Sequence, residues 1–259
     1  MKEHLSDMNS KGYAFLGVQI KDEDIDWFAK DILSKKKQEV SRFGKEACVE
    51  NAYFDIAKCL YNQEEKYEEL LCSDWLNESV NNLVGENAII YDIFGLTNLD
   101  QDNDQHRRNE WHRDQMFLGG IRASVLYFVP LVDFTEENGP TEVLSGSHWE
   151  RDIPSDEECD SRSEKIFAKR GEVFVVDSSL VHRAGFNKSG SPRPALLIRY
   201  QLPFLIRQIN LSRHYEKIKN ELPDLLVQRF GFGLEFDDLE SSVFSERPKN
   251  IYNVKYYES

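Results

Sequence analysis

The sequence has few of the features that mark membrane, secreted or nucleic-acid-binding proteins. No apolar run approaches the roughly 18 residues of a membrane span, and residues 1–11 are polar, without the apolar stretch of a signal peptide. Lys and Arg number 32 against 46 Asp and Glu, which gives a net charge of −14. Such a chain offers no broad basic face to nucleic acid or to an anionic membrane. We therefore expect a cytoplasmic protein without a nucleic-acid or membrane partner.

Cysteine is scarce too, and the four cysteines form no C-x-x-C pair, which argues against a zinc-thiolate or redox motif. We expect all four to be reduced. They are Cys48, Cys59, Cys72 and Cys159. Hydrophobic residues, by contrast, make up 40% of the 259 residues and aromatic residues 12%. A sizeable core can therefore form, and we expect one domain spanning residues 1–259.

The first third of the chain carries mainly helical patterns, over about residues 20–85. Apolar residues follow helical spacing after Asp22, a predicted N-cap, and the lysines at 35–37 would end that helix at a solvated terminus. A second amphipathic helix is predicted over residues 50–72. A third begins at Ser73 as its N-cap.

Strand patterns dominate from Asn87 onward. Apolar runs predict strands in one block separated by turns, which favours an all-β barrel or jelly roll over a parallel α/β sheet. The predicted strands cover 12–20, 88–94, 121–132, 141–144, 171–177 and 195–202. Residues 97–110 and 150–165 are polar and are predicted to be exposed loops that could act as lids. A helical segment is predicted again over about 211–230.

The most informative stretch is WHRDQ at residues 111–115. His112 and Asp114 stand one residue apart, so their side chains lie on one face of an extended strand and could bind one side of a metal ion. His182, shortly after the strand predicted at 171–177, would supply a third ligand. Two histidines and one carboxylate form the facial triad of non-haem Fe(II) oxygenases, which leaves other coordination positions open. The spacing alone fits equally well a surface strand whose His112 and Asp114 share a hydrogen bond.

Arg193 opens the next predicted strand, eleven residues after His182. Its guanidinium could bind a carboxylate through two parallel hydrogen bonds, or it could be a surface cation. Trp111 is expected to pack on the opposite face from His112, and Gln115 likewise points away from the metal. His148 is expected in a turn or beside the ligands rather than among them.

A basic island stands out in this acidic chain. It is either a solvated loop or a feature that attracts an anionic substrate into a cleft. Its members are His106, Arg107, Arg108 and Arg113.

Four motifs, taken in order, resemble the phytanoyl-CoA dioxygenase family of Fe(II)/2-oxoglutarate oxygenases over roughly residues 8–205. The motifs are WHRDQ at 111–115, ENGP at 137–140 with SGSH at 145–148, the run from GE at 171–172 through Asp177 to His182, and H-x-x-G-x-N-x-S-x-x-x-R at 182–193. Members of the family usually carry proline in the turn where this chain has Ser145. That departure touches no candidate ligand.

The resemblance implies a double-stranded β-helix, the jelly-roll or cupin-like fold. This is an all-β core with flanking N- and C-terminal α-helices (α+β), with the core at about 87–205 and a helical tail at about 206–259. It implies that iron is held at the catalytic centre, and that an arginine pairs with the distal carboxylate of 2-oxoglutarate. The implied iron ligands are His112, Asp114 and His182, and the implied arginine is Arg193.

The same resemblance implies a dioxygenase that uses Fe(II), 2-oxoglutarate and O₂ and releases succinate and CO₂. Related halogenases replace the carboxylate ligand with a small residue, so Asp114 favours hydroxylation, desaturation or ring closure. We expect a small metabolite or biosynthetic intermediate as substrate, and a monomer or homodimer. Two alternatives stay open: a catalytically inactive jelly-roll binding protein, and a metal-dependent cupin enzyme that does not use 2-oxoglutarate.

Overall fold

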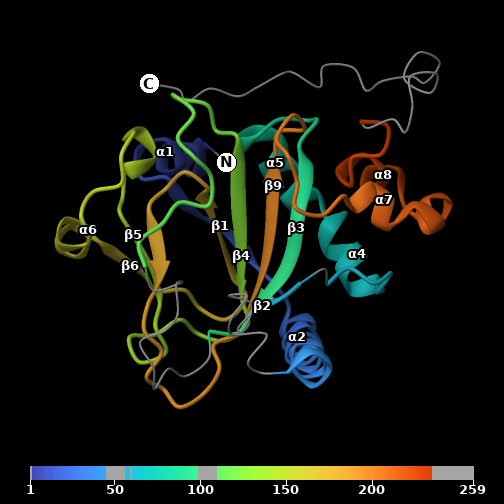
Figure 1. Ribbon diagram of the computed structural model, residues 1–259, viewed down its shortest axis with the longest axis horizontal. Helices are drawn as coiled ribbons and strands as arrows, with labels where there is room; N and C mark the ends of the chain where they lie inside the picture. The colour runs from blue at the N-terminus through green and yellow to red at the C-terminus, as the bar shows by residue number, and fades with distance from the viewer. Residues whose placement is uncertain (1, 45–55, 59, 99–109, 235–259) are drawn as a thin grey trace.

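The computed structural model describes residues 2–44, 56–58, 60–98 and 110–234. At its centre a six-stranded sheet and a three-stranded sheet pack together, and every strand pairing is antiparallel (Figure 1). The large sheet has the order β1-β7-β4-β9-β3-β2, formed by β1 Tyr13–Gln19, β7 Glu172–Asp177, β4 Ser124–Pro130, β9 Ala195–Gln201, β3 Ile89–Leu96 and β2 Ile56–Ala57. The small sheet has the order β6-β5-β8, formed by β6 Glu164–Ile166, β5 Thr141–Val143 and β8 His182–Ala184.

Helices flank the two sheets, with α6 beside the small sheet and α2, α4, α7 and α8 beyond β3 (Figure 1). They are α1 Lys2–Ser10, α2 Asp22–Phe43, α4 Glu65–Leu71, α5 Asp74–Leu83, α6 Asp156–Arg162, α7 Leu211–His214 and α8 Asp224–Arg229. Two 3₁₀ helices, Ser147–Trp149 and Glu216–Glu221, complete the elements. The predicted jelly-roll fold, its six predicted strands and the helical segment predicted at about 211–230 are thereby confirmed. Of the helical tail predicted at about 206–259, residues 235–259 lie outside the described residues. Within the described ranges no helix is long and apolar enough to cross a membrane.

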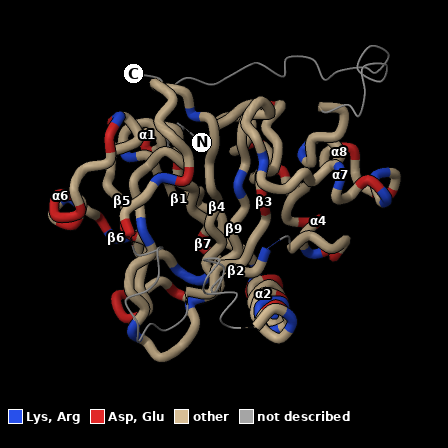
Figure 2. The backbone as a smooth tube through the Cα atoms, in the orientation of Figure 1, with Lys and Arg blue, Asp and Glu red and all other residues tan. Residues whose placement is uncertain are grey.

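The central strand β4 is buried on both faces. Val125, Tyr127 and Val129 belong to the core that the helices close, whereas Leu126 and Phe128 pack between the two sheets. Successive side chains of a strand point to opposite faces, so a strand between two packed layers reads as a continuous apolar run. Figure 2 shows the outcome: β4 carries no charged residue, while acidic and basic residues gather on outer helices such as α2 and α6.

Helices α2 and α5 begin where they were predicted but without the predicted side-chain caps. Helix α2 begins at Asp22 and α5 at Asp74, and the cap residues Lys21 and Ser73 accept no hydrogen bond through their side chains. The Ser73 hydroxyl instead donates to the carbonyl oxygen of Leu70 at 2.7 Å. Acidic residues in the first turn of each helix supply the negative charge that suits a helix N-terminus.

Helix α2 continues to Phe43, so the prediction that it ends at the lysines 35–37 is wrong. Lys36 is only 6% exposed, and its ammonium donates to the carbonyl oxygen of Ile56 at 2.9 Å and to Glu39 at 3.1 Å. A lysine stem can be buried along apolar surface while its charge reaches polar partners. The lysine run therefore anchors the middle of the helix to the sheet edge.

The prediction of one helix over residues 50–72 is also wrong within the described residues. Ile56–Ala57 is strand β2, which pairs with the end of β3, and helix α4 begins only at Glu65. A short apolar run fits helix and strand equally well by spacing. Backbone hydrogen bonds to a sheet edge decide between them here, and spacing does not reveal those. Residues 50–55 and 59 lie outside the described residues.

Residues 150–165 are not the predicted loop, because they contain α6 and most of β6. Ser155 caps α6 by accepting a hydrogen bond from the backbone amide of Glu158, as a Ser-x-x-Glu sequence favours. Cys159 is fully buried beneath the helix, and β6 pairs with β5. The segment is thus ordered secondary structure: a helix followed by an edge strand of the small sheet.

Candidate metal centre

The three predicted ligands come together beside β8. His182 is the first residue of that strand, and His112 forms an isolated antiparallel bridge with it. The His112 amide donates to the His182 carbonyl at 3.1 Å, and the His182 amide donates back at 2.9 Å. The predicted strand at 111–115 is therefore reduced to one bridge, with Asp114 two residues beyond it. One ligand atom from each of His112, Asp114 and His182 lies within 4.8 Å of the others.

Both imidazoles are oriented by backbone carbonyl groups. Nδ1 of His112 lies 2.9 Å from the carbonyl oxygen of Glu110, and Nδ1 of His182 lies 2.9 Å from that of Leu180. A carbonyl oxygen only accepts, so each Nδ1 carries the hydrogen and each Nε2 keeps a lone pair for a metal. Burial, with a smaller effect of His112, lowers the pKa of His182 to about 4. That ring is therefore neutral near pH 7, as a metal ligand must be.

Asp114 is held ionised by a residue that sequence analysis did not single out. Burial acts to raise the pKa of Asp114, but the positive charge of Arg199, helped by the two imidazoles, holds it well below its usual range. Nη2 of Arg199 forms an ion pair with Oδ2 of Asp114. The other oxygen, Oδ1, lies 4.0 Å from Nε2 of His112. One oxygen thus faces the histidines while Arg199 holds the other.

Arg193 is fully buried, so it is not a surface cation. With His112, Asp114 and His182 it lines a narrow cavity of about 60 Å³, which we call the inner cavity. The Arg193 guanidinium stacks 4.0 Å from the ring centre of Phe134. The cavity is also lined by Arg183, but carboxylates of Glu142 and Asp160 already pair with that side chain. The planar, charged fork of Arg193 is suited to a carboxylate.

The motif residues around His182 build the frame that positions Arg193. Asn187 is fully buried, and its side-chain amide donates to the carbonyl oxygens of Asn98, at 2.6 Å, and Ser191, at 2.8 Å. Gly139 has a φ of +73°, and a Cβ there would overlap the backbone of Gly185. The turn of the ENGP motif therefore requires glycine to pass this close to the strand that carries His182.

Two of the other predicted residues take structural roles. His148 is buried, its Nε2 lies 3.0 Å from the carbonyl oxygen of Asn9, and it stands outside the triad. Trp111 packs away from the metal ligands, as predicted. Its Nε1 donates to Asp160 at 2.9 Å, and the Arg183 guanidinium lies 4.3 Å from the ring centre. These contacts fix helix α6 against the segment that carries His112.

Of the four residues of the basic island, the structure describes only Arg113. The Arg113 guanidinium donates to the carbonyl oxygens of Ser147, Glu150 and Arg151 at 2.8–2.9 Å. Its donors hold the turn at 147–151, and its side chain also lines a cavity beside His112 and Asp114, so the alternative in which Arg113 attracts an anionic substrate stays a prediction. The remaining members lie outside the described residues: His106, Arg107 and Arg108.

Arg199 could have been found from the sequence. It interrupts the apolar run ALLIRYQL and stands six residues after Arg193, so alternation along an extended chain puts both on one face. It lines a second, wider cavity of about 360 Å³, which we call the outer cleft and which also reaches His112 and Asp114. The inner cavity and the outer cleft thus share two of the three candidate ligands.

The donor set fits a non-haem iron ion. Two neutral imidazole nitrogens and one ionised carboxylate are the ligands of the facial triad. No thiolate contributes among the described residues, since the two described cysteines, Cys72 and Cys159, stand outside the cluster. The ligands approach from one side, and the two cavities border them on the others. The site could therefore hold a metal and admit two further molecules to it.

Sequence comparisons point to one family. A sequence model of the phytanoyl-CoA dioxygenase family matches residues 8–195. Dioxygenase hkm4 of Aspergillus hancockii is 35% identical over 88 residues, which cover 30% of this chain and 28% of hkm4. An uncharacterised protein of Mycobacterium tuberculosis is 33% identical over 107 residues, 41% of this chain and 39% of that protein. The matched region therefore spans well under two thirds of these curated relatives.

Solved structures share the fold at low sequence identity. EctD from S. alaskensis, solved with 2-oxoglutarate and 5-hydroxyectoine, superposes with a TM-score of 0.62 at 19% identity, covering 78% of this chain and 76% of EctD. The non-heme monooxygenase ThoJ gives a TM-score of 0.61 at 16% identity and covers 80% of each chain. At these identities the likeness establishes the fold alone.

Proposed function

Because this chain belongs to the phytanoyl-CoA dioxygenase family, whose model matches residues 8–195, we propose that it is an Fe(II)- and 2-oxoglutarate-dependent oxygenase. The proposed reaction hydroxylates a small metabolite or biosynthetic intermediate. In it 2-oxoglutarate and O₂ are consumed, one oxygen atom enters the substrate, and succinate and CO₂ leave. The observation that carries the proposal is the convergence of His112, Asp114 and His182 beside a cavity that contains a buried arginine.

The residues of the chain have separate roles in this proposal. His112, Asp114 and His182 would hold the iron, which supplies with 2-oxoglutarate and O₂ the oxidising power that protein side chains lack. Arg193 would bind the distal carboxylate of 2-oxoglutarate through a charge-assisted pair. The apolar walls of the inner cavity, including Leu126 and Phe128, exclude water from it.

The 2-oxoglutarate assignment is supported by two observations. Arg193 is a buried cation that lines the inner cavity together with the three candidate ligands. The structural relative EctD was solved with 2-oxoglutarate. The carboxylate of Asp114 favours hydroxylation over halogenation, since an ionised ligand occupies the position that a halide would need.

Fe(II) and 2-oxoglutarate added anaerobically to the purified protein test the proposal. Bound together, they should give a weak visible charge-transfer band, and admitting O₂ should release succinate even with a poor substrate. A binding protein without activity would release no succinate. A cupin enzyme that does not use 2-oxoglutarate would bind Fe(II) without producing the band. Absence of both signals would sink the proposal.

A further inference from the structure

The outer cleft differs from the inner cavity in size and in chemistry. Its volume of about 360 Å³ falls within the range of small-molecule sites, whereas the inner cavity measures about 60 Å³. The residues that set its character are polar or charged. Besides His112 and Asp114, they are Lys58, Tyr91, Asp92, Arg113, Arg199 and Gln208. Arg193 lines the inner cavity, so 2-oxoglutarate is assigned to that cavity. The substrate, which is the molecule that is oxidised, is then assigned to the outer cleft.

A β-bulge assembles the polar wall of the cleft. In the pairing of β3 with β9, Ile90 stands opposite Tyr200, but the next pair is Asp92 with Arg199, so Tyr91 is an extra residue. A bulge re-aims side chains locally. As a result Tyr91 and Asp92 both line the outer cleft beside Arg199, and the Arg199 guanidinium lies 5.0 Å from the ring centre of Tyr91.

The hydrogen-bonding capacity of Arg199 is mostly unused. A guanidinium has five N–H donors, and one nitrogen, Nη2, meets Oδ2 of Asp114. Nε is buried and has no hydrogen-bond partner among the described residues. A buried donor without an acceptor is costly. This orphaned donor, in the wall of a cleft beside the candidate metal ligands, therefore points to a ligand group that accepts from it.

The charges of the site point to the same group. In the site proposed above, the formal charges sum to zero. They are those of a divalent metal, Asp114, the two carboxylates of 2-oxoglutarate and Arg193. Arg199 and Arg113 then remain as positive charges of the cleft, while Lys58 and Asp92 offset each other. A partly enclosed charge of this kind favours an anion. The donors of Arg113 meet backbone carbonyl oxygens, so Arg199 is the guanidinium placed to receive that anion, and its planar fork fits a carboxylate.

We propose that the outer cleft binds the substrate of the oxidation through a carboxylate group. Arg199 would bind this carboxylate while it keeps its ion pair with Asp114. The substrate class is therefore a small carboxylic acid. The inference rests on the proposed function, because it concerns the same site once metal and 2-oxoglutarate are in place. Arg199 acts as a specificity-determining residue, distinct from Arg193, which serves 2-oxoglutarate.

The test compares two probes of equal shape, hexanoate and hexanamide. Their dissociation constants are measured by ligand-observed NMR titration on the full chain saturated with Zn(II), which has no redox chemistry, and with 2-oxoglutarate. The wild type is expected to bind hexanoate about tenfold tighter or more, as a charge-assisted hydrogen bond implies. Equal affinities in the wild type would overturn the inference without any variant.

Two variants assign the preference to its residue. Arg199→Gln should bring the two affinities together, and Arg199→Lys should keep part of the preference, because it retains the charge but loses the fork. Lys169→Gln removes an exposed cation that lines neither cavity and should keep the full preference. If the preference persists in Arg199→Gln, the carboxylate is bound by the metal or elsewhere, and the inference is wrong.

The same titrations separate this inference from the proposed function. Failure of the wild type to bind metal or 2-oxoglutarate would overturn both. Binding of both, with no preference between hexanoate and hexanamide, would overturn only the assignment of a carboxylic acid substrate.

Discussion

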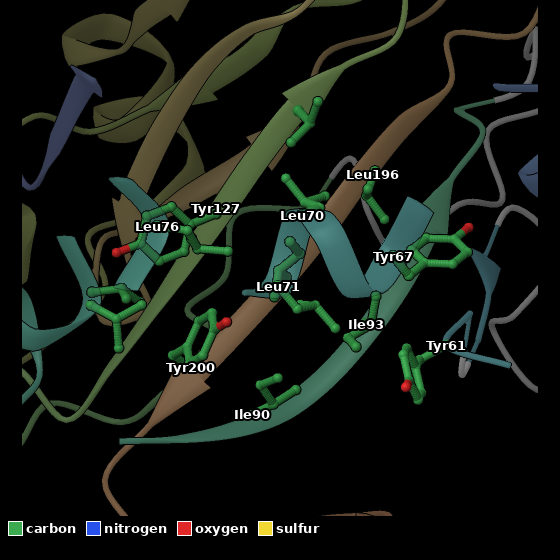
Figure 3. Close-up of a cluster of buried hydrophobic side chains, with 14 of the residues drawn as sticks. Tyr61, Tyr67, Leu70, Leu71, Leu76, Ile90, Ile93, Tyr127, Leu196 and Tyr200 are labelled. Carbon is green, nitrogen blue, oxygen red and sulfur yellow. The ribbon is translucent and has the colours of Figure 1, made fainter. Parts of the chain in front are cut away.

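The two faces of the six-stranded sheet differ in what they bury. On the face toward the helices, Leu196, Ile198 and Tyr200 of β9 are fully buried in one apolar core. Figure 3 shows Leu196 and Tyr200 in this core. On the face toward the small sheet, Leu197 lines the inner cavity and Arg199 lines the outer cleft. Neighbouring residues of one strand therefore belong to a closed core and to an open site.

One arginine on each face, Arg229 fully buried and Arg199 largely buried, shows the difference. On the helix side, Arg229 is 1% exposed and donates to neutral oxygens only, the carbonyls of Ala88 at 2.8 Å and Glu86 at 3.1 Å and the side chain of Asn81 at 2.7 Å. On the cavity side, Arg199 meets the carboxylate of Asp114, and its Nε has no hydrogen-bond partner in the part of the chain that the structure describes. Burial of a charge does not mark function by itself; the partners do. Arg229, with its donors satisfied, fastens α8 to the sheet, whereas Arg199 is the residue for which we propose a ligand.

The comparison predicts that changes on the cavity side alter binding and that changes on the helix side alter stability. The largest expected effect is that of Asp114→Ala. Removing a metal ligand should lower metal affinity by at least about a hundredfold and abolish succinate release, while the circular dichroism spectrum stays that of the wild type. Glu157→Ala, an exposed carboxylate on α6, is the matched control. Succinate production equal to that of the wild type in Asp114→Ala would show that the ligand assignment is wrong.

The substitution Arg193→Gln should have the second largest effect, and the effect should be on 2-oxoglutarate binding. Loss of the charge-assisted pair should raise the dissociation constant for 2-oxoglutarate by about a hundredfold, with metal binding retained, as measured by titrating the visible band. Arg162→Gln removes an exposed cation of α6 and should leave that constant unchanged. A weakening in both variants would instead indicate a general effect of net charge.

A pair of neighbouring truncations on β9 tests the two faces directly. Ile198→Ala should lower the free energy of unfolding by about 3 kcal/mol, because it opens a cavity in the closed core, yet leave the 2-oxoglutarate affinity of the folded protein unchanged. Leu197→Ala removes a wall of the inner cavity and should change that affinity. Urea unfolding and 2-oxoglutarate titration measure the two quantities. If Ile198→Ala and Leu197→Ala changed the affinity for 2-oxoglutarate equally, the proposed distinction between the two faces would be wrong.

The smallest expected effect is that of Tyr200→Phe. The Tyr200 hydroxyl is buried on the helix side and has no hydrogen-bond partner among the described residues. Removing an unpaired buried hydroxyl should raise the free energy of unfolding by up to about 1 kcal/mol, seen as a small rise in thermal midpoint. A loss of stability would show that the hydroxyl has an acceptor, such as an ordered water.

The candidate site could be anticipated from the sequence to the extent that it depends on local spacing. One residue between His112 and Asp114, and the position of His182 just after a buried run, brought the three ligands into one hypothesis. The role of Arg199 was missed, although its place in an apolar run was visible. Its significance depends on Asp114, which is 85 residues away in the chain and meets it only in the folded protein.

The sequence by itself determined the six strands and a barrel or jelly roll, because apolar runs bounded by turns are typical of strands buried between layers. It also put His112 and Asp114 on one side, because side-chain direction along a strand has a fixed period of two. Only the tertiary structure decided that residues 56–57 form an edge strand and that a bulge turns both Tyr91 and Asp92 toward Arg199. It also divided the space at the triad into an inner cavity and an outer cleft. The physical reason is that cross-strand register is set by hydrogen bonds between distant segments, which leave no period in the sequence.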